Sequence, residues 1–556
     1  MTTSPKCSVP DAIWFNGQIL TMNPAQTDAQ AFAVSQGKIT AVGDNEHIRA
    51  LAGGLTVMHD LGGQFVMPGL IDTHAHGVWG SVRDLFEVYV GLSSSLEELL
   101  AAVQQRCANV PTGQWISGGP WFSSWIADLA QSPCQLLDQV SPNHPVALKD
   151  VTYHTAWVNT AALRICGITR DTPDPQGGRI GRDPHSGEPN GILYETAQDL
   201  PRRHVAPSPD QISHAVTHMS RYFHSLGLTG FKEAKASEEE LSGYAHADAQ
   251  GQLNLHVAVH MPWNSLASTE RTEVAQLLTW REQYRSKHVH TDFIKMFLDG
   301  VAPTLTAAFL EPYLPAPGCK PGVHDPDAML AVAPGDLAKI VTELDRHGFV
   351  IKMHAVGDRA VRAGLDGVQA ARTANGQSGL RHEIGHTGFV HESDYPRFKD
   401  LDVVAEMSPR LWFPNPVTPG QHKVLGPVRA NRCHQIRTLL DAGAELTYGS
   451  DWPAAAADAN PWIGLAGMIS RRNPFGLFPG YVGQEQAIPL ERALPLFTTN
   501  AARSMGLEQV TGALRPGLSA DFIRLERHLA ALSPEEIART QVLETWFEGR
   551  QVFSLA

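Results

Sequence analysis

The sequence lacks several features of membrane and secreted proteins. No stretch approaches the roughly 20 consecutive apolar residues of a membrane-spanning helix. The first residues contain no apolar core of a signal peptide. The six cysteines are scattered and form no Cys-x-x-Cys pair, which is typical of free thiols in a reducing compartment. We therefore expect a cytoplasmic protein that does not bind a membrane.

Basic runs are also absent. The 44 Lys and Arg stand against 57 Asp and Glu, so the net charge is −13. Nucleic acids and anionic lipids are bound through clustered positive charge, so we expect neither as a partner. No repeat of fixed period is present, which argues against a solenoid. A small-molecule partner is the remaining expectation, and a homo-oligomer stays open.

What the chain does have is length, turns and apolar residues. Its 556 residues are 43% hydrophobic and include 49 Gly and 38 Pro, which suits a large α/β protein. The two ends read as short strands, with a hairpin signal at Asn16-Gly17. Neither end has enough strands for a sheet domain alone. We predict one small β-sandwich domain built jointly from residues 8–65 and 505–556.

Between the ends, strand-like runs alternate with helical patterns. Eight such runs begin near residues 66, 228, 253, 292, 349, 380, 402 and 445. This alternation predicts a (β/α)₈ TIM barrel over residues 66–504, with its chemistry at the C-terminal ends of the strands. About 150 residues separate the first two runs, more than one helix needs. We predict an inserted subdomain at about 80–210, rich in Trp, Gly and Pro, which overhangs the active face.

The first strand ends in His74 and His76. Residues two apart on a strand face the same side, and two neutral imidazoles can hold one divalent metal. With 25 histidines, about one His-x-His pair is expected by chance, so the pair needs context. His288 and His290 form a second pair in a polar stretch, which we interpret as a solvated loop.

Four further polar residues lie on or just after predicted strands: Lys295, His354, His386 and Asp451. Taken singly, each histidine is more often a core residue, and the aspartate could be a helix N-cap. A lysine between Ile294 and Met296 is harder to explain, because burying its charge is costly. Core packing does not predict all of these residues at strand ends, so we interpret them, with the first pair, as a metal site.

The chain resembles the amidohydrolase superfamily and, within it, the YtcJ-like group of the amidohydrolase-3 family. The motifs that carry the resemblance cover nearly the whole chain: Met67 to His76, Tyr153 to Leu163, Gly187 to Glu195, Ile294 to Gly300, His354 to Ala360, Gly449 to Asp451 and Arg515 to Asp521. The resemblance implies a barrel with a β-sandwich built from both chain ends. One departure is Gly385, because this group usually has glutamate before the sixth-strand histidine, and Glu383 lies nearby.

The resemblance also implies roles for the candidate residues. His74 and His76 would bind a first metal, and His354 and His386 a second. Lys295 would be N6-carboxylated and bridge the two. Asp451 would be both a ligand and the general base. The implied cofactor is one or two Zn²⁺, although the donors also suit Mn²⁺, Fe²⁺ or Co²⁺.

The expected reaction is hydrolysis of a linear, non-peptide amide C–N bond by metal-activated hydroxide. A bulky, partly aromatic N-acyl or N-substituted amide is the preferred substrate. The alternatives are an ester, a cyclic amide or a decarboxylation at the same metal site, and a non-catalytic scaffold. Candidate substrate-binding residues come from the insert and from later loops: Trp121, Tyr153, Arg410 and Trp412.

Overall fold

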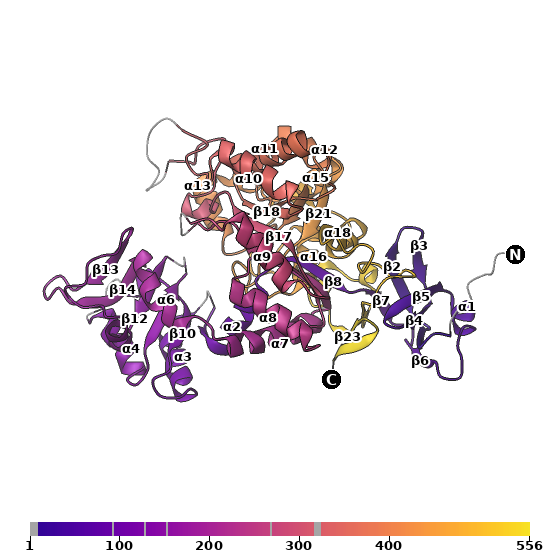
Figure 1. Ribbon diagram of the computed structural model, residues 1–556, viewed down its shortest axis with the longest axis horizontal. Helices are drawn as coiled ribbons and strands as arrows, with labels where there is room; N and C mark the ends of the chain where they lie inside the picture. The colour runs from indigo at the N-terminus through magenta and orange to yellow at the C-terminus, as the bar shows by residue number, and fades with distance from the viewer. Residues whose placement is uncertain are drawn as a thin grey trace. The chain divides into compact units, whose positions relative to one another are not determined.

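The structure is a computed structural model that describes residues 9–555 except 92–93, 127–128, 130, 152–153, 267–269 and 316–323. It forms two compact units, one of Met1–Gly77 with Thr217–Ala556 and one of Val78–Val216 (Figure 1). Among the described residues, no helix is both long enough and apolar enough to cross a membrane.

Eight parallel strands form the central sheet of the first unit, in the order β21-β20-β19-β18-β17-β16-β15-β8. They are β8 (Leu70–Ala75), β15 (Leu228–Glu233), β16 (His256–Pro262), β17 (Val289–Phe297), β18 (Val350–Ala355), β19 (Glu383–His386), β20 (Val404–Met407) and β21 (Glu445–Tyr448). The two outermost strands also meet, because the Thr73 hydroxyl of β8 donates to the Tyr448 carbonyl of β21 at 2.8 Å. The predicted (β/α)₈ barrel is confirmed.

The barrel strands are buried on both faces because side chains fill the interior and helices cover the outside. All six residues of β8 and all six of β15 are buried. Helices α10 (Pro334–Arg346) and α11 (Asp358–Asn375) pack against each other and against β18. Charged side chains inside such strands therefore need an explanation beyond core packing.

The first predicted strand is in fact two. β7 (Phe65–Pro68) ends at Pro68, and β8 begins after Gly69. β7 belongs to the small β-sandwich, where it pairs antiparallel with β22 (Phe522–Leu525) from the other end of the chain. A side chain at Gly69 would clash, since its Cβ would lie 2.2 Å from the Thr229 hydroxyl. The strand that carries His74 is thus joined directly to the sandwich.

The sandwich consists of two sheets that share one apolar core. One sheet has the order β5-β4-β1-β6, and the other β24-β23-β22-β7-β2-β3. Its strands from the two chain ends are β1 (Ala12–Phe15), β2 (Gln18–Asn23), β3 (Gln26–Ala29), β4 (Ala31–Ser35), β5 (Lys38–Gly43), β6 (Val57–Asp60), β23 (Val542–Phe547) and β24 (Arg550–Ser554). Trp14, Phe32, Phe522 and Trp546 fill the core, where the Trp14 and Phe32 rings stack at 5.2 Å.

The second unit has its own six-stranded sheet, in the order β13-β14-β12-β11-β10-β9. The strands are β9 (Val88–Tyr89), β10 (Ile116–Trp121), β11 (Val146–Asp150), β12 (Thr155–Val158), β13 (Gly178–Arg182) and β14 (Pro189–Glu195). Helices α3 (Leu96–Ala108) and α4 (Pro133–Val140) pack on it. The tryptophans of this region serve its core: Trp121 and Trp157 are buried and meet edge to face at 5.6 Å.

The interpretation of His288 and His290 as a solvated loop was wrong. His288 is only 6% exposed and His290 lies on β17. The His288 ring contacts the Asp248 carboxylate at 2.6 Å through Nδ1 and the Glu548 carboxylate at 3.2 Å through Nε2. Glu548 comes from the C-terminal end of the chain. The local sequence around His288 therefore could not reveal the contact that helps to bury it.

Candidate metal centre

His74 and His76 both project from the C-terminal end of β8 toward Asp451, which follows β21. The Asp451 Oδ1 atom lies 3.7 Å from His74 Nε2 and 3.5 Å from His76 Nε2. One donor atom from each of the three residues falls within 4.8 Å of the others, a spacing that suits a shared metal ion. The Lys295 amine, on β17, is 3.3 Å from His74 Nε2. Four of the six predicted ligands therefore converge on one point.

The other two predicted ligands lie beside this group. The His386 ring centroid is 4.6 Å from that of His74 and 4.4 Å from that of His354. His354, at the end of β18, is oriented by Asp299, whose Oδ1 lies 3.1 Å from Nδ1. Asp299 in turn accepts backbone hydrogen bonds from Val356 and Gly357. The six residues form one continuous cluster at the C-terminal end of the barrel.

Burial sets the charge state of this cluster. Burial lowers the pKa of His74 and of His386 well below the usual range, and the neighbouring cations reinforce the effect. Burial, together with the positive charge of Lys352, lowers the pKa of Lys295 to about 7. His74 and His386 are thus neutral, the form in which imidazole binds metals.

Two of the predicted ligands have left-handed backbone conformations. The φ angle is +72° at His386 and +56° at Asp451. Such angles cost about 1–3 kcal/mol in residues other than glycine, and they persist where the surrounding structure enforces them. The adjacent glycines help: a Cβ at Gly449 would lie 2.4 Å from the His74 Cβ. The chain bends at these two strand ends so that both side chains face the centre.

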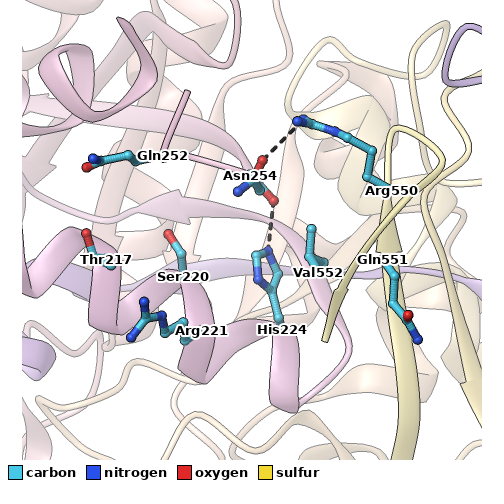
Figure 2. A pocket seen from close by; sticks show the side chains of 9 residues that line it. All are labelled: Thr217, Ser220, Arg221, His224, Gln252, Asn254, Arg550, Gln551 and Val552. Atoms are coloured by element: carbon cyan, nitrogen blue, oxygen red, sulfur yellow. Dashed lines mark hydrogen bonds between the residues drawn. The ribbon is translucent and has the colours of Figure 1, made fainter. Parts of the chain in front are cut away.

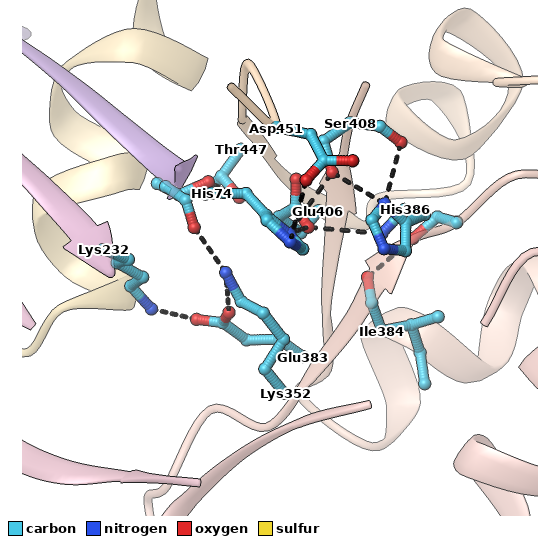
Figure 3. A network of polar contacts seen from close by, with 12 residues as sticks. His74, Lys232, Lys352, Glu383, Ile384, His386, Glu406, Ser408, Thr447 and Asp451 are labelled. Carbon is cyan, nitrogen blue, oxygen red and sulfur yellow. Dashed lines mark hydrogen bonds and ion pairs between the residues drawn. The ribbon is translucent and has the colours of Figure 1, made fainter. Parts of the chain in front are cut away.

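Glu406 on β20 is a site residue that sequence reasoning missed. Its Oε2 lies 2.6 Å from His74 Nδ1 and accepts the His386 backbone N–H at 3.2 Å (Figure 3). Burial raises its pKa to about 7, against the opposing pull of Lys352. The signal was present in the sequence, because Glu406 is a lone acid in the apolar run Val403 to Met407, as Lys295 is a lone base in its own run.

A second missed feature is a buried charge triad of Lys232, Glu383 and Lys352, from β15, β19 and β18 (Figure 3). All three side chains are fully buried. Glu383 pairs directly with Lys232, and its other oxygen lies 3.2 Å from the Lys352 amine. Lys352 also donates to the carbonyl of Thr73, the residue before His74. The triad thus lies beside the first ligand strand.

The candidate substrate-binding residues have other partners in the structure. The Arg410 guanidinium donates to the Asp458 carboxylate at 3.0 Å and to the Asn460 carbonyl at 2.7 Å. It therefore holds the loop that follows Asp451. Trp412 is fully buried and donates to the Gly464 carbonyl. Neither side chain presents more than a tenth of its surface.

The two remaining candidates belong to the inserted region. Trp121 lies in the core of the second unit and donates to the Leu148 carbonyl at 3.1 Å. Tyr153 falls outside the described residues. A substrate-binding role for these four side chains therefore remains a prediction from the sequence.

A surface cavity of about 460 Å³ lies away from the cluster (Figure 2). Its lining includes His224 at the end of α7 (Pro209–Ser225), Asn254 before β16 and Arg550 on β24. His224 Nε2 contacts the Asn254 carbonyl at 2.8 Å, and Arg550 donates to the Asn254 side chain at 3.2 Å. His224 precedes β15 and Asn254 precedes β16, at the end of the barrel opposite to the predicted ligands, and Arg550 belongs to the sandwich. None of the three is a predicted site residue.

Three known proteins are similar to this chain over nearly its whole length. The chain is 29% identical to Protein LONG AFTER FAR-RED 3 of Arabidopsis thaliana over 99% of this chain and 93% of that protein. It is 27% identical to the N-substituted formamide deformylase of Arthrobacter pascens, over 97% of each chain. It is 26% identical to the putative amidohydrolase YtcJ of Bacillus subtilis, over 98% of this chain and 99% of that protein.

Among solved structures, an uncharacterized metal-dependent hydrolase from Pyrococcus horikoshii is similar in fold. Its TM-score is 0.75 at 21% identity, over 94% of this chain and 99% of that chain. The sequence pattern of the amidohydrolase family matches residues 58–553, nearly the whole chain. The chain therefore belongs to the amidohydrolase family, and it is a hydrolase that acts on carbon–nitrogen bonds.

Proposed function

We propose that this amidohydrolase is metal-dependent and cleaves the C–N bond of a linear amide, of the bulky and partly aromatic N-acyl or N-substituted class. The observation that carries the proposal is the convergence of His74, His76, Asp451 and Lys295 at one strand end of the barrel. The similarity to an N-substituted formamide deformylase supports a linear amide as the substrate.

The donor set fits a divalent metal. Buried, neutral imidazoles and a carboxylate share one point, and such nitrogen and oxygen donors suit Zn²⁺. His74, His76 and Asp451 would hold a first ion, and His354 and His386 a second. When bound, the metal acidifies a coordinated water and polarises the carbonyl of the substrate.

Lys295 would link the two ions as its N6-carboxylate. Its amine nitrogen, about half neutral at its pKa of about 7, would form a bond to the carbon of CO₂ and release one proton. The product is an anion with two oxygen donors in place of a buried cation. Because a buried lysine cation is costly, the modification removes the main objection to a lysine at this position.

Asp451 would move the protons of the reaction. Its carboxylate faces both first-strand histidines, and its backbone is fixed by donation of the Asp451 N–H to the His74 carbonyl at 2.7 Å. The carboxylate would accept a proton from the attacking water and deliver it to the leaving nitrogen, which departs as a neutral amine. General acid–base catalysis of this kind contributes about 10²–10⁴-fold to the rate.

A substrate panel tests the proposal. Protein loaded with Zn²⁺, Mn²⁺ or Co²⁺ is assayed with N-acyl amines, N-substituted formamides, cyclic amides, esters and aromatic carboxylic acids. We expect amine release from linear amides with apolar or aromatic substituents. Turnover confined to esters or cyclic amides, or CO₂ release from the acids, would instead support the alternatives at the same metal site.

A substitution tests the role of the base. In Asp451→Asn we expect kcat to fall by at least about 100-fold while metal analysis still finds bound ion. Asp366→Asn is the matched control, because Asp366 is a helix carboxylate that pairs with Arg397 near the surface. Near-normal kcat in Asp451→Asn would remove Asp451 as the base.

A further inference from the structure

The position of Glu406 is unusual for a carboxylate. It is fully buried on a barrel strand, and its Oε1 has no hydrogen-bond partner among the described residues. An unsatisfied buried oxygen is costly and calls for an explanation. The explanation lies with Oε2, which contacts His74 Nδ1 at 2.6 Å and accepts the His386 N–H at 3.2 Å. One oxygen atom thus connects a ligand candidate of β8 with one of β19.

The contact with His74 fixes which ring nitrogen can bind a metal. With Glu406 as the carboxylate, the neutral His74 ring donates its one proton from Nδ1 to Oε2 at 2.6 Å. The lone pair of His74 is then left on Nε2. That atom is the one that faces the Lys295 amine at 3.3 Å and the Asp451 carboxylate at 3.7 Å. The ring is therefore held in the tautomer and orientation that the metal centre requires.

Ser408, two residues along from Glu406, extends the same arrangement. Its hydroxyl lies 3.0 Å from His386 Nδ1 and 3.3 Å from His74 Nδ1 (Figure 3). Asp299 provides a comparison, because it contacts His354 alone among the predicted ligands that the structure describes. Glu406 differs in that it contacts two of the histidines, His74 and His386.

The neighbouring strands leave room for this carboxylate. A Cβ at Gly449 would lie 2.7 Å from Glu406 Oε1, closer than real contacts allow. A Cβ at Gly385 would already lie 3.5 Å from Oε2. Glycine therefore flanks Glu406 on β19 and just after β21, and a larger residue at position 449 would displace either the carboxylate or the His74 ring.

We propose that Glu406 is a positioning residue of the metal centre, which sets the tautomer and orientation of His74 through Nδ1 and ties it to His386 through the backbone. Glu406 neither binds the metal nor contacts the substrate in this role. The inference rests on the proposed metal-dependent function, but it concerns metal affinity and makes no claim about the bond that is cleaved.

Two nearly isosteric variants separate the acceptor from the bulk of the side chain. Glu406→Met fills the same space without an acceptor, and Glu406→Gln keeps one acceptor oxygen. Glu445→Gln is the matched control, since Glu445 begins the adjacent strand β21 and pairs with the partly exposed Arg503. Zn²⁺ affinity is measured on the full chain by chelator competition, metal stoichiometry by elemental analysis, and ligand geometry by the visible spectrum of the Co²⁺ form.

We expect Glu406→Met to weaken Zn²⁺ binding about 10- to 100-fold and to alter the Co²⁺ spectrum. Glu406→Gln should keep the full stoichiometry and recover most of the affinity, and Glu445→Gln should match the wild type. Unchanged affinity in Glu406→Met would overturn the proposal. So would the loss of a whole metal equivalent in Glu406→Gln, which would make Glu406 a ligand, or failure of both Glu406 variants to fold without metal.

The two hypotheses can fail separately. A wild type that binds Zn²⁺ through a Glu406-dependent site but releases no amine from any amide would contradict the proposed function and leave this inference standing. A wild type that binds no divalent metal would contradict both.

Discussion

Glu383→Gln removes the single negative charge that holds two buried lysines inside the barrel. Glu383 pairs with Lys232, and its second oxygen lies 3.2 Å from Lys352. All three side chains are fully buried. Glutamine has nearly the same shape, so the change creates no cavity. It leaves two ammonium groups in the barrel core without their shared counter-charge.

The magnitude follows from this burial. Removal of one partner of a buried ion pair costs about 3–5 kcal/mol, because the other charge stays desolvated and uncompensated. We expect the free energy of unfolding of Glu383→Gln to fall by that amount near neutral pH. Lys232 retains a hydrogen bond to the Ser504 carbonyl at 2.7 Å, which compensates in part but brings no negative charge.

The destabilisation should depend on pH. Burial lowers the pKa of Lys232 to about 8 even though Glu383 pulls it upward, whereas the unfolded value is about 10.4. Between these values the unfolded chain binds more protons, so stability gains with rising pH. Without Glu383 the pKa of Lys232 in the folded protein falls further, so the rise in stability with pH begins at a lower pH. The difference from the wild type should therefore be largest below the lowered pKa of Lys232 in the variant and shrink as the pH rises to about 8, where the folded wild type also releases this proton.

Urea unfolding of the metal-free protein, followed by tryptophan fluorescence and circular dichroism at several pH values, measures this effect. Glu445→Gln is the matched control, because its partner Arg503 has a side chain that is 41% exposed. An exposed pair contributes about 1 kcal/mol or less. If Glu383→Gln lost no more stability than Glu445→Gln, or lost an amount independent of pH, the reasoning would be refuted.

Three further outcomes are expected. Gly449→Ala should weaken Zn²⁺ binding at least about tenfold, because its Cβ would lie 2.4 Å from the His74 Cβ. Gly335→Ala, where the added Cβ meets open space, should leave Zn²⁺ affinity unchanged. Equal Zn²⁺ affinities of the two variants in chelator competition would contradict this expectation. His288→Ala should lower the free energy of unfolding by about 2–3 kcal/mol and leave kcat unchanged, because it removes the hydrogen bond to the Asp248 carboxylate, whose side chain is 5% exposed. Urea unfolding and the amide assay measure these two quantities, and wild-type stability would refute the expectation. Chelation should abolish amide hydrolysis and added Zn²⁺ restore it, so turnover by metal-stripped protein would count against metal dependence.

Much of the barrel could be predicted from the sequence because its signals are local. Apolar runs alternate with helical patterns, and each run corresponds to a strand of the central sheet. His74 and His76 could be found because a period of two puts both on one face of a strand. Lys295 stood out because it interrupts an apolar run. The same test, applied to Val403 to Met407, identifies Glu406.

The features that were missed depend on partners far apart in the chain. The pairing of Glu383 with Lys232 joins residues 151 positions apart, and no local pattern reveals it. The partners of Arg410 are Asp458 and Asn460, which lie about 50 positions later. Trp412 likewise donates to the Gly464 carbonyl, 52 positions later. The sequence identifies each polar side chain. Its hydrogen-bond or ion-pair partner becomes known only when the barrel is closed.

Three lysines point into this barrel, and their partners distinguish their roles. Lys232 and Lys352 share Glu383. Lys295 has no carboxylate within 4 Å among the described residues, and its amine contacts His74 Nε2 at 3.3 Å. Burial lowers its pKa to about 7, below the value of about 8 for Lys232. Lys232 and Lys352 share a carboxylate, whereas the Lys295 amine has no such direct partner. This difference supports the proposal that Lys295, rather than Lys232 or Lys352, is the lysine that reacts with CO₂.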